Sequence, residues 1–184
     1  ENLLDAWVEA GSDPALLADP AHLPKMRVRT WADGDCDGHD GVTAEAMGEA
    51  LSELRHAGIG MQKARLERLS EDLPQSNLSV NPPEALMARI AALQQELGEG
   101  GDHMASRHSR KPFKQFVAMV RAKIPTDAAL AHEYKNVQEV LADLKLLRES
   151  LVAVGEAQVA RTYVFPAERR LMAFGFHAAA LDYR

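Results

Sequence analysis

Two stretches of strand character lie near opposite ends of the chain, and the long interval between them constrains the fold more than any other feature. Residues 26–31 alternate apolar with polar side chains and are rich in β-favouring types. Residues 174–182 are nearly continuous apolar sequence, which is typical of a parallel strand covered on both faces. Because parallel neighbours need long crossover connections, we predict a mostly helical chain in which these two strands lie side by side.

Amphipathic helices are predicted to fill the interval between the strands. Thr43 is placed to cap a long helix. The apolar face of this helix is marked by Met47, Leu51, Leu54, Gly58, Met61 and Leu69. Further helices are expected over about 86–97, 112–124, 136–154 and 166–172, and the polar segment 99–111 is predicted to be a surface loop.

Two glycines interrupt the long helix. Gly58 and Gly60 would each cost about 1 kcal/mol relative to alanine in a helix interior. We therefore expect the helix either to be weak at this point or to lie close to another part of the backbone.

The composition is that of a globular protein rather than a nucleic-acid-binding or membrane protein. The 184 residues are 46% hydrophobic and 26% charged, which suits a globular domain, and we interpret 1–184 as a single incomplete domain. A net charge of −6 argues against nucleic-acid binding. The apolar runs are shorter than the roughly 20 residues that span a bilayer. Cys36 is the single cysteine and has no internal disulfide partner, so we expect a reducing, cytoplasmic location without membrane contact.

The two ends of the chain raise a separate expectation. The sequence starts at Glu1, without methionine, in what is predicted to be a helix, and it stops at Arg184 directly after the second strand. We expect the chain to be cut from a longer protein, and we do not expect a complete active site within it.

An acidic segment holds the densest cluster of functional residue types. Asp33, Asp35 and Asp37 alternate with other residues and are followed by Gly38, which matches the first half of a Ca²⁺-binding loop. The second half does not match, because the twelfth position is alanine and the nearest carboxylate, Glu45, comes one residue late. Calcium binding, a solvated turn and an active-site loop at the end of a barrel strand therefore remain open for this segment.

Two longer motifs carry a resemblance to a known family. Residues 28–43 resemble the pattern F-G-S-W-x-G-G-D-R-D-G-N-P-x-V-T, with Trp31, Asp35, Asp37, Gly38, Val42 and Thr43 at the same spacing. Residues 174–184 resemble F-G-F-H-L-A-x-L-D-x-R-Q. On these motifs and their order, the chain resembles an internal segment of a bacterial-type phosphoenolpyruvate carboxylase.

The resemblance implies a fold and a reaction. The fold would be part of an α/β barrel of the TIM type, enlarged by helical insertions, with the two motifs on neighbouring strands. The reaction of the parent enzyme, a carboxy-lyase that fixes inorganic carbon, would convert phosphoenolpyruvate and bicarbonate to oxaloacetate and phosphate. It would need Mg²⁺ or Mn²⁺, whose ligands are not expected in this chain, and the parent would be a homo-oligomer.

The resemblance also implies roles for individual residues. Arg184 would bind an anionic group of the substrate, with a structural salt bridge to Asp182 or Asp35 as the alternative. Trp31, Asp35, Asp37 and Gly38 would belong to the active-site loop. His177 is interpreted as a packed core residue of the second strand rather than a catalytic base.

Departures from the family pattern limit these expectations. Cys36 replaces an arginine of the family motif and so removes a positive charge, while Asp33 replaces a glycine. The family's T-A-H-P-T-E motif with its catalytic histidine, its Gly- and Arg-rich loop and its metal-binding acids are absent from these 184 residues. We therefore expect the chain alone to be inactive, and a non-catalytic helical scaffold remains an alternative.

Overall fold

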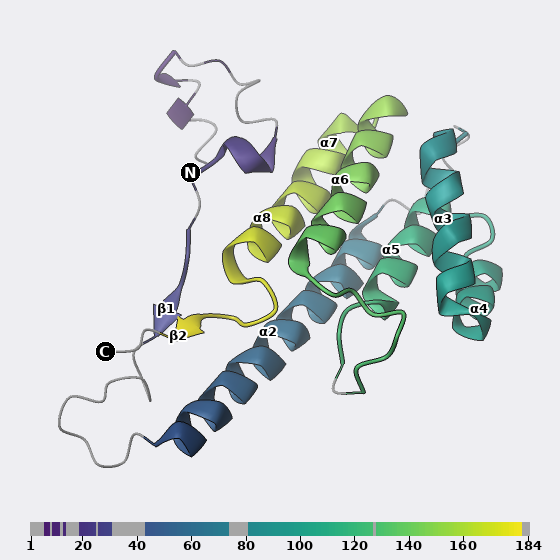
Figure 1. Cartoon of the computed structure of the whole chain (residues 1–184). Coiled ribbons are helices and arrows are strands. Elements are labelled where there is room, and N and C mark those ends of the chain that lie inside the picture. Colours follow the sequence, from purple (N-terminus) through teal and green to yellow (C-terminus); the bar gives the residue numbers. More distant parts are fainter. Residues whose placement is uncertain are drawn as a thin grey trace.

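The computed structural model describes residues 6–7, 9–11, 13, 19–24, 26–30, 43–73, 81–126 and 128–181 (Figure 1). The described elements, in chain order, are η2 (Pro20–His22), β1 (Arg29–Thr30), α2 (Ala44–Asp72), α3 (Glu84–Leu97), α4 (Glu99–Arg107), α5 (Pro112–Ala122), α6 (Val137–Ala153), α7 (Ala157–Val159), the π-helical turn η3 (Ala160–Val164), α8 (Phe165–Phe174) and β2 (Ala180–Leu181). This part of the chain is mostly helical with two short strands, as predicted.

The two strands pair in parallel, although nearly the whole chain separates them. Arg29 lies opposite Ala180 and Thr30 lies opposite Leu181. The Ala180 amide donates a hydrogen bond to the Val28 carbonyl oxygen at 2.9 Å. The prediction that the two ends of the chain meet as parallel neighbours is therefore confirmed for these residues.

The second strand is much shorter than the predicted 174–182. Helix α8 continues through Phe174 and ends at Gly175, whose φ of 55° is one that glycine adopts readily. Periodicity cannot separate a short apolar strand from a buried helix end, and here Ala167 and Leu171 extend a helical face up to this point. His177 lies in the bend that follows and is exposed, so its interpretation as a packed strand residue is wrong.

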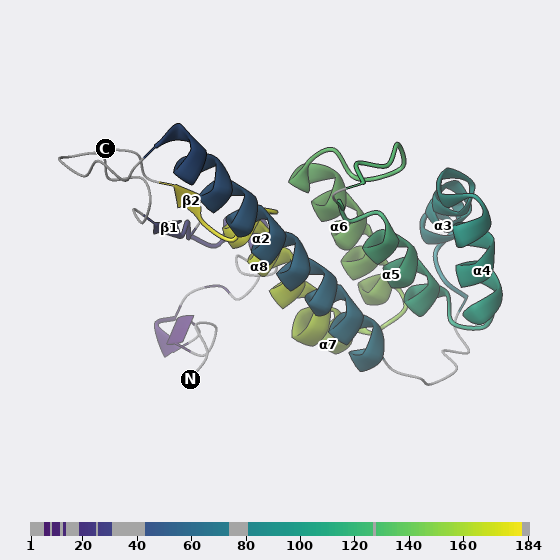
Figure 2. The ribbon, with the colours of Figure 1, turned by 90° about the horizontal axis from the view of Figure 1, so that it is seen from below.

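The long helix α2 begins where the sequence predicted. The Thr43 hydroxyl accepts a hydrogen bond from the Ala46 amide at 3.1 Å and caps the helix. The predicted apolar face is buried only from Gly58 onward, since Leu51 is 47% exposed. The first half of α2 therefore extends beyond the packed helices, toward the strand pair (Figure 2).

Residues 99–107 form helix α4 and not the predicted loop, so that only the turn at 108–111 remains of it. Glu99 and Asp102 in the first turn and Arg107 in the last turn suit the helix dipole. Gly101 is buried against α3, where a Cβ would lie 2.8 Å from the Gln94 Cα. This glycine allows close packing between two helices.

The hydrophobic core lies among α2, α3, α5, α6 and α8. Helix α5 is central, because it contacts α2, α3, α4 and α6. The largest fully buried apolar side chains are Phe116, Leu69, Leu73, Leu86, Leu93, Met119, Ile124, Leu144, Leu147, Leu151 and Leu171. In both ribbon views the strand pair lies at the end of the molecule opposite α3 and α4 (Figures 1 and 2).

A π-helical turn joins α7 to α8. Pro166 has no backbone N–H, so an uninterrupted α-helix would lose a hydrogen bond at this point. The wider turn over Ala160–Val164 accommodates the proline, and Arg65 of α2 donates to the Tyr163 carbonyl oxygen at 3.2 Å. Pro166 thus opens the last helix, as predicted, and α2 supports the turn before it.

Candidate functional site

The common end of β1 and β2 is the candidate site. Because the strands are parallel, the chain leaves Thr30 and Leu181 at the same end of the pair. The predicted site residues Trp31, Asp33, Asp35, Asp37, Gly38 and Arg184, with the calcium alternative among them, follow these two positions and lie outside the described residues. The described residues therefore show where the two segments that carry the predicted site residues begin, after Thr30 and after Leu181.

An arginine of α8 holds the segment that leads into β1. Arg169 donates to the Pro20 carbonyl oxygen at 3.0 Å and to the Pro24 carbonyl oxygen at 2.6 Å. A guanidinium suits this task because its donors spread over several acceptors in one plane. The short η2 turn is therefore fixed to α8 a few residues before the strand begins.

A buried carboxyl group lies beside this contact. Glu168 is 2% exposed and accepts a hydrogen bond from Arg148 Nε at 2.8 Å, while Arg148 also lies 3.9 Å from Asp19. Burial raises the pKa of Glu168 to about 7, and the attraction of Arg148 only partly offsets it. This carboxyl group changes its charge near neutral pH.

The segment that leads into β2 is held by α2. The Gln62 side chain is buried, and its Nε2 donates to the Gly175 carbonyl oxygen at 2.9 Å. One turn earlier, Gly58 faces the backbone of 176–178, where a Cβ would lie 2.5 Å from the Phe176 carbonyl carbon. The expectation that a glycine of this helix lies close to another backbone is confirmed at Gly58, whereas Gly60 has open space around it.

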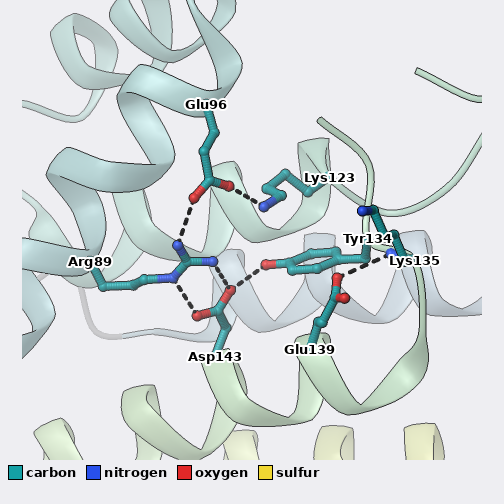
Figure 3. Close-up of polar contacts among 7 residues, drawn as sticks. All are labelled: Arg89, Glu96, Lys123, Tyr134, Lys135, Glu139 and Asp143. Atoms are coloured by element: carbon teal, nitrogen blue, oxygen red, sulfur yellow. Dashed lines mark hydrogen bonds and ion pairs between the residues drawn. The ribbon is translucent and has the colours of Figure 1, made fainter. Parts of the chain in front are cut away.

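A second polar cluster lies in the helical body, where side chains of α3 and α6 meet (Figure 3). Arg89 of α3 donates from Nε to Asp143 Oδ1 at 2.7 Å and from Nη2 to Asp143 Oδ2 at 2.9 Å. The Tyr134 hydroxyl donates to Asp143 Oδ2 at 2.5 Å. Arg89 also pairs with Glu96, which accepts from Lys123, and the Lys123 ammonium lies 4.6 Å from the centre of the Tyr134 ring.

The charges in this cluster satisfy one another. The Asp143 hydrogen bond raises the pKa of Arg89, and burial raises the pKa of Tyr134. Burial opposes ionisation of Glu96, but hydrogen bonds from Lys123 and Arg89 outweigh it and lower its pKa. Asp143 already accepts three hydrogen bonds. We therefore interpret the cluster as structural: it holds Lys123 and Tyr134 against α3 and α6.

The sequence held a signal for this cluster. Asp143 lies between Val140 and Leu144 on the apolar face of α6, and a carboxylate on a buried face needs a cationic partner. The identity of that partner could not be derived, because Arg89 is 54 positions away along the chain.

Metal binding and membrane insertion find no support in the described part of the chain. Its His, Cys, Asp and Glu side chains form no group of three or more that could hold a metal ion. Among the same residues, no helix combines the length and the apolar character needed to cross a membrane.

Comparison with protein families matches residues 14–184 to the model described as phosphoenolpyruvate carboxylase. The chain is 30% identical over 189 residues to the phosphoenolpyruvate carboxylase of Azoarcus sp. strain BH72, covering 95% of this chain and 20% of that relative. It is 32% identical over 190 residues to the enzyme of the same name from Aromatoleum aromaticum, covering 100% and 20%.

A third relative of the same name, from Thermus sp. strain 71, is 32% identical over 160 residues, covering 86% of this chain and 16% of its own length. The chain thus spans a fifth or less of the length of these curated relatives.

Proposed function

The chain belongs to the phosphoenolpyruvate carboxylase family, and we propose that it is an internal segment of such an enzyme, which supplies two neighbouring strands and part of the substrate site. One observation carries this proposal: β1 and β2 pair in parallel, so the two family motifs leave the pair at the same end. Ligands of α/β folds bind at the carboxyl ends of parallel strands.

We propose that the strand pair is part of an α/β barrel whose other strands come from elsewhere in the longer protein. Parallel sheets are normally covered on both faces, and a pair of two-residue strands is too short to be stable alone. Met26 and Val28, which precede β1, are 69% and 40% exposed. Other strands or helices of the longer protein would cover these apolar side chains. The helices α3–α6 would then be an insertion on the barrel.

The reaction proposed for the whole enzyme is carboxylation of phosphoenolpyruvate by bicarbonate, giving oxaloacetate and phosphate. Arg184 would hold the phosphate or the carboxylate of the substrate, since a guanidinium is charged at every working pH. Trp31, Asp35, Asp37 and Gly38 would form the facing loop, with the two carboxylates orienting basic groups around the anion. Cys36 takes the place of one such basic group.

A divalent metal, Mg²⁺ or Mn²⁺, is part of the proposed chemistry of the whole enzyme, where it would stabilise developing negative charge. The described residues do not fit this ion, because they contain no suitable cluster of ligands. We therefore assign no residue of this chain to it. The cytoplasmic location and the homo-oligomeric state of the whole enzyme are part of the same proposal.

A coupled assay for oxaloacetate tests the proposal. The protein as its gene encodes it should form oxaloacetate from phosphoenolpyruvate and bicarbonate with Mg²⁺, and the isolated 184 residues should not. Arg184→Gln in the encoded protein should raise the KM for phosphoenolpyruvate by about tenfold or more, because one charge-assisted contact is lost. An encoded protein without carboxylation, or turnover by the isolated 184 residues, would contradict the proposal.

A further inference from the structure

The described part of the strand pair is short. It covers two residues of each strand, and the Ala180 amide also donates a hydrogen bond to the Val28 carbonyl oxygen just before β1. A slip by one residue would turn every side chain of the strand to the other face. Contacts outside so short a pair therefore help to set the position of β2.

Helix α2 supplies these contacts. At Gly58 the backbone of 176–178 approaches so closely that a Cβ would lie 2.6 Å from the Ala178 nitrogen. Four residues later, Gln62 is 3% exposed and its amide donates to the Gly175 carbonyl oxygen at 2.9 Å. The two contacts lie on one face of α2 and hold the whole segment between α8 and β2.

The held segment has an unusual conformation. Gly175 and Ala178 both have positive φ, at 55° and 52°. Alanine has no side-chain hydrogen bond to offset this strain, so the conformation persists only where the surroundings impose it. The close backbone contact at Gly58 is next to Ala178 and provides such a constraint.

We propose that Gly58 and Gln62 are positioning residues of the substrate site. By holding 175–178 against α2 they set the register of β2 on β1, and thereby the place from which the chain continues to Arg184. This inference rests on the proposed function, since it takes Arg184 as the residue that binds the substrate anion. Gly58 and Gln62 themselves touch no substrate and act only through the strand.

Kinetics of the protein as its gene encodes it test the inference. Gly58→Ala places a methyl group against the 176–178 backbone, and Gln62→Met removes the hydrogen bond at nearly constant side-chain length. Both should raise the KM for phosphoenolpyruvate about fivefold or more, with kcat changed about twofold at most, because a displaced binding group weakens ground state and transition state alike. The matched control Gly60→Ala, on the same helix in open space, should leave both constants unchanged.

A double-mutant cycle with Arg184→Gln separates positioning from a general loss of structure. If Gln62 acts through Arg184, adding Gln62→Met to Arg184→Gln should change the KM no further. Amide hydrogen exchange provides a second reading. Peptides covering 175–181 should exchange about tenfold faster in Gln62→Met, while peptides covering α5 should be unaffected.

The outcomes distinguish the two proposals. A raised KM in Arg184→Gln together with an unchanged KM in both α2 variants would overturn this inference and leave the proposed function standing. Additive effects of Gln62→Met and Arg184→Gln would also overturn it. An unchanged KM in Arg184→Gln would overturn the proposed binding residue, and the inference with it. If Gly58→Ala does not fold, Gln62→Met decides alone.

Discussion

The helical body and the strand pair are built in opposite ways. In the body, α5 contacts four other helices, and the Arg89–Asp143 pair makes further hydrogen bonds to Glu96 and Tyr134. The described strand pair has two residues on each side and is held by a few contacts from α2 and α8. Most of the stability is therefore expected in the body, while a few contacts at its edge hold the described strand residues.

The largest expected effect concerns the buried cluster of the body. Asp143→Ala would leave Arg89 and the Tyr134 hydroxyl without their shared acceptor, and should lower the free energy of unfolding by about 3–5 kcal/mol. Chemical denaturation measures this. Lys145→Ala is the control, because its ion pair with Glu149 is exposed and should contribute about 0.5 kcal/mol at most. Equal losses in both variants would contradict the division into body and edge.

The two glycines of α2 sharpen the comparison at the edge. Gly58→Ala should destabilise the protein by about 1–3 kcal/mol, because the backbone at 176–178 must move away from the new methyl group. Gly60→Ala should stabilise it by about 0.5–1 kcal/mol, because alanine is the better helix former and has space. Thermal or urea unfolding of the two variants measures the difference, and changes of the same sign would argue against the close approach.

Glu168 provides a pH test at the contact between body and edge. Its pKa of about 7 in the folded protein lies above the ordinary 4.5, so the folded state binds this proton more tightly than the unfolded state. The contribution of this bound proton to the free energy of unfolding should be fully present below about pH 4.5 and lost as the pH rises through 7. The free energy of unfolding should then decrease by about 1–3 kcal/mol.

The groups that act on this carboxyl are Arg148, Asp19 and Glu149. Unfolding free energies of the wild type and Glu168→Gln, measured from pH 5 to 8, isolate its contribution. The wild-type curve should fall with rising pH relative to that of the variant. Parallel curves would show that burial does not govern this carboxyl group.

The smallest expected effect compares two helix caps. Asn136 caps α6 in the body, where its side chain accepts from the Glu139 amide at 3.1 Å, and Asn136→Ala should cost about 1 kcal/mol of global stability. Thr43 caps the exposed half of α2, and Thr43→Ala should fray that end while changing global stability by less than about 0.5 kcal/mol. Urea unfolding with amide exchange over 44–54 measures both, and a larger global loss for Thr43→Ala would contradict this view.

Features that depend on residues close together in the sequence could be predicted, and most features that depend on distant residues could not. The cap at Thr43 and the start of the last helix near residue 166 are local signals, and they are confirmed. The parallel pairing of the strands followed from a general rule about connections, and it is confirmed too.

The errors have a common physical origin. Gly101 lies in a helix that packs closely on α3, and Phe174 ends a helix whose buried face includes Ala167 and Leu171. Local propensity contains neither kind of packing. Arg89 and Asp143 could not be paired in advance for the same reason. The roles of Asp35, Asp37 and Arg184 stay predictions, because these residues lie outside the described part of the chain.

The π-helical turn at Ala160–Val164 has a consequence for how this protein can tolerate insertions and deletions. A π-helical turn closes hydrogen bonds from i to i+5 and so holds about one residue more per turn than an α-helix, which lets it gain or lose one residue without rotating α8 by the roughly 100° of an α-helical residue. After the loss of one residue there, the face that carries Ala167 and Leu171 should stay on the core, and Arg169 should still face the Pro20 and Pro24 carbonyls. A change of one residue should therefore be tolerated in this turn, whereas the same change within the regular part of α8 would rotate its apolar face by about 100° out of the core.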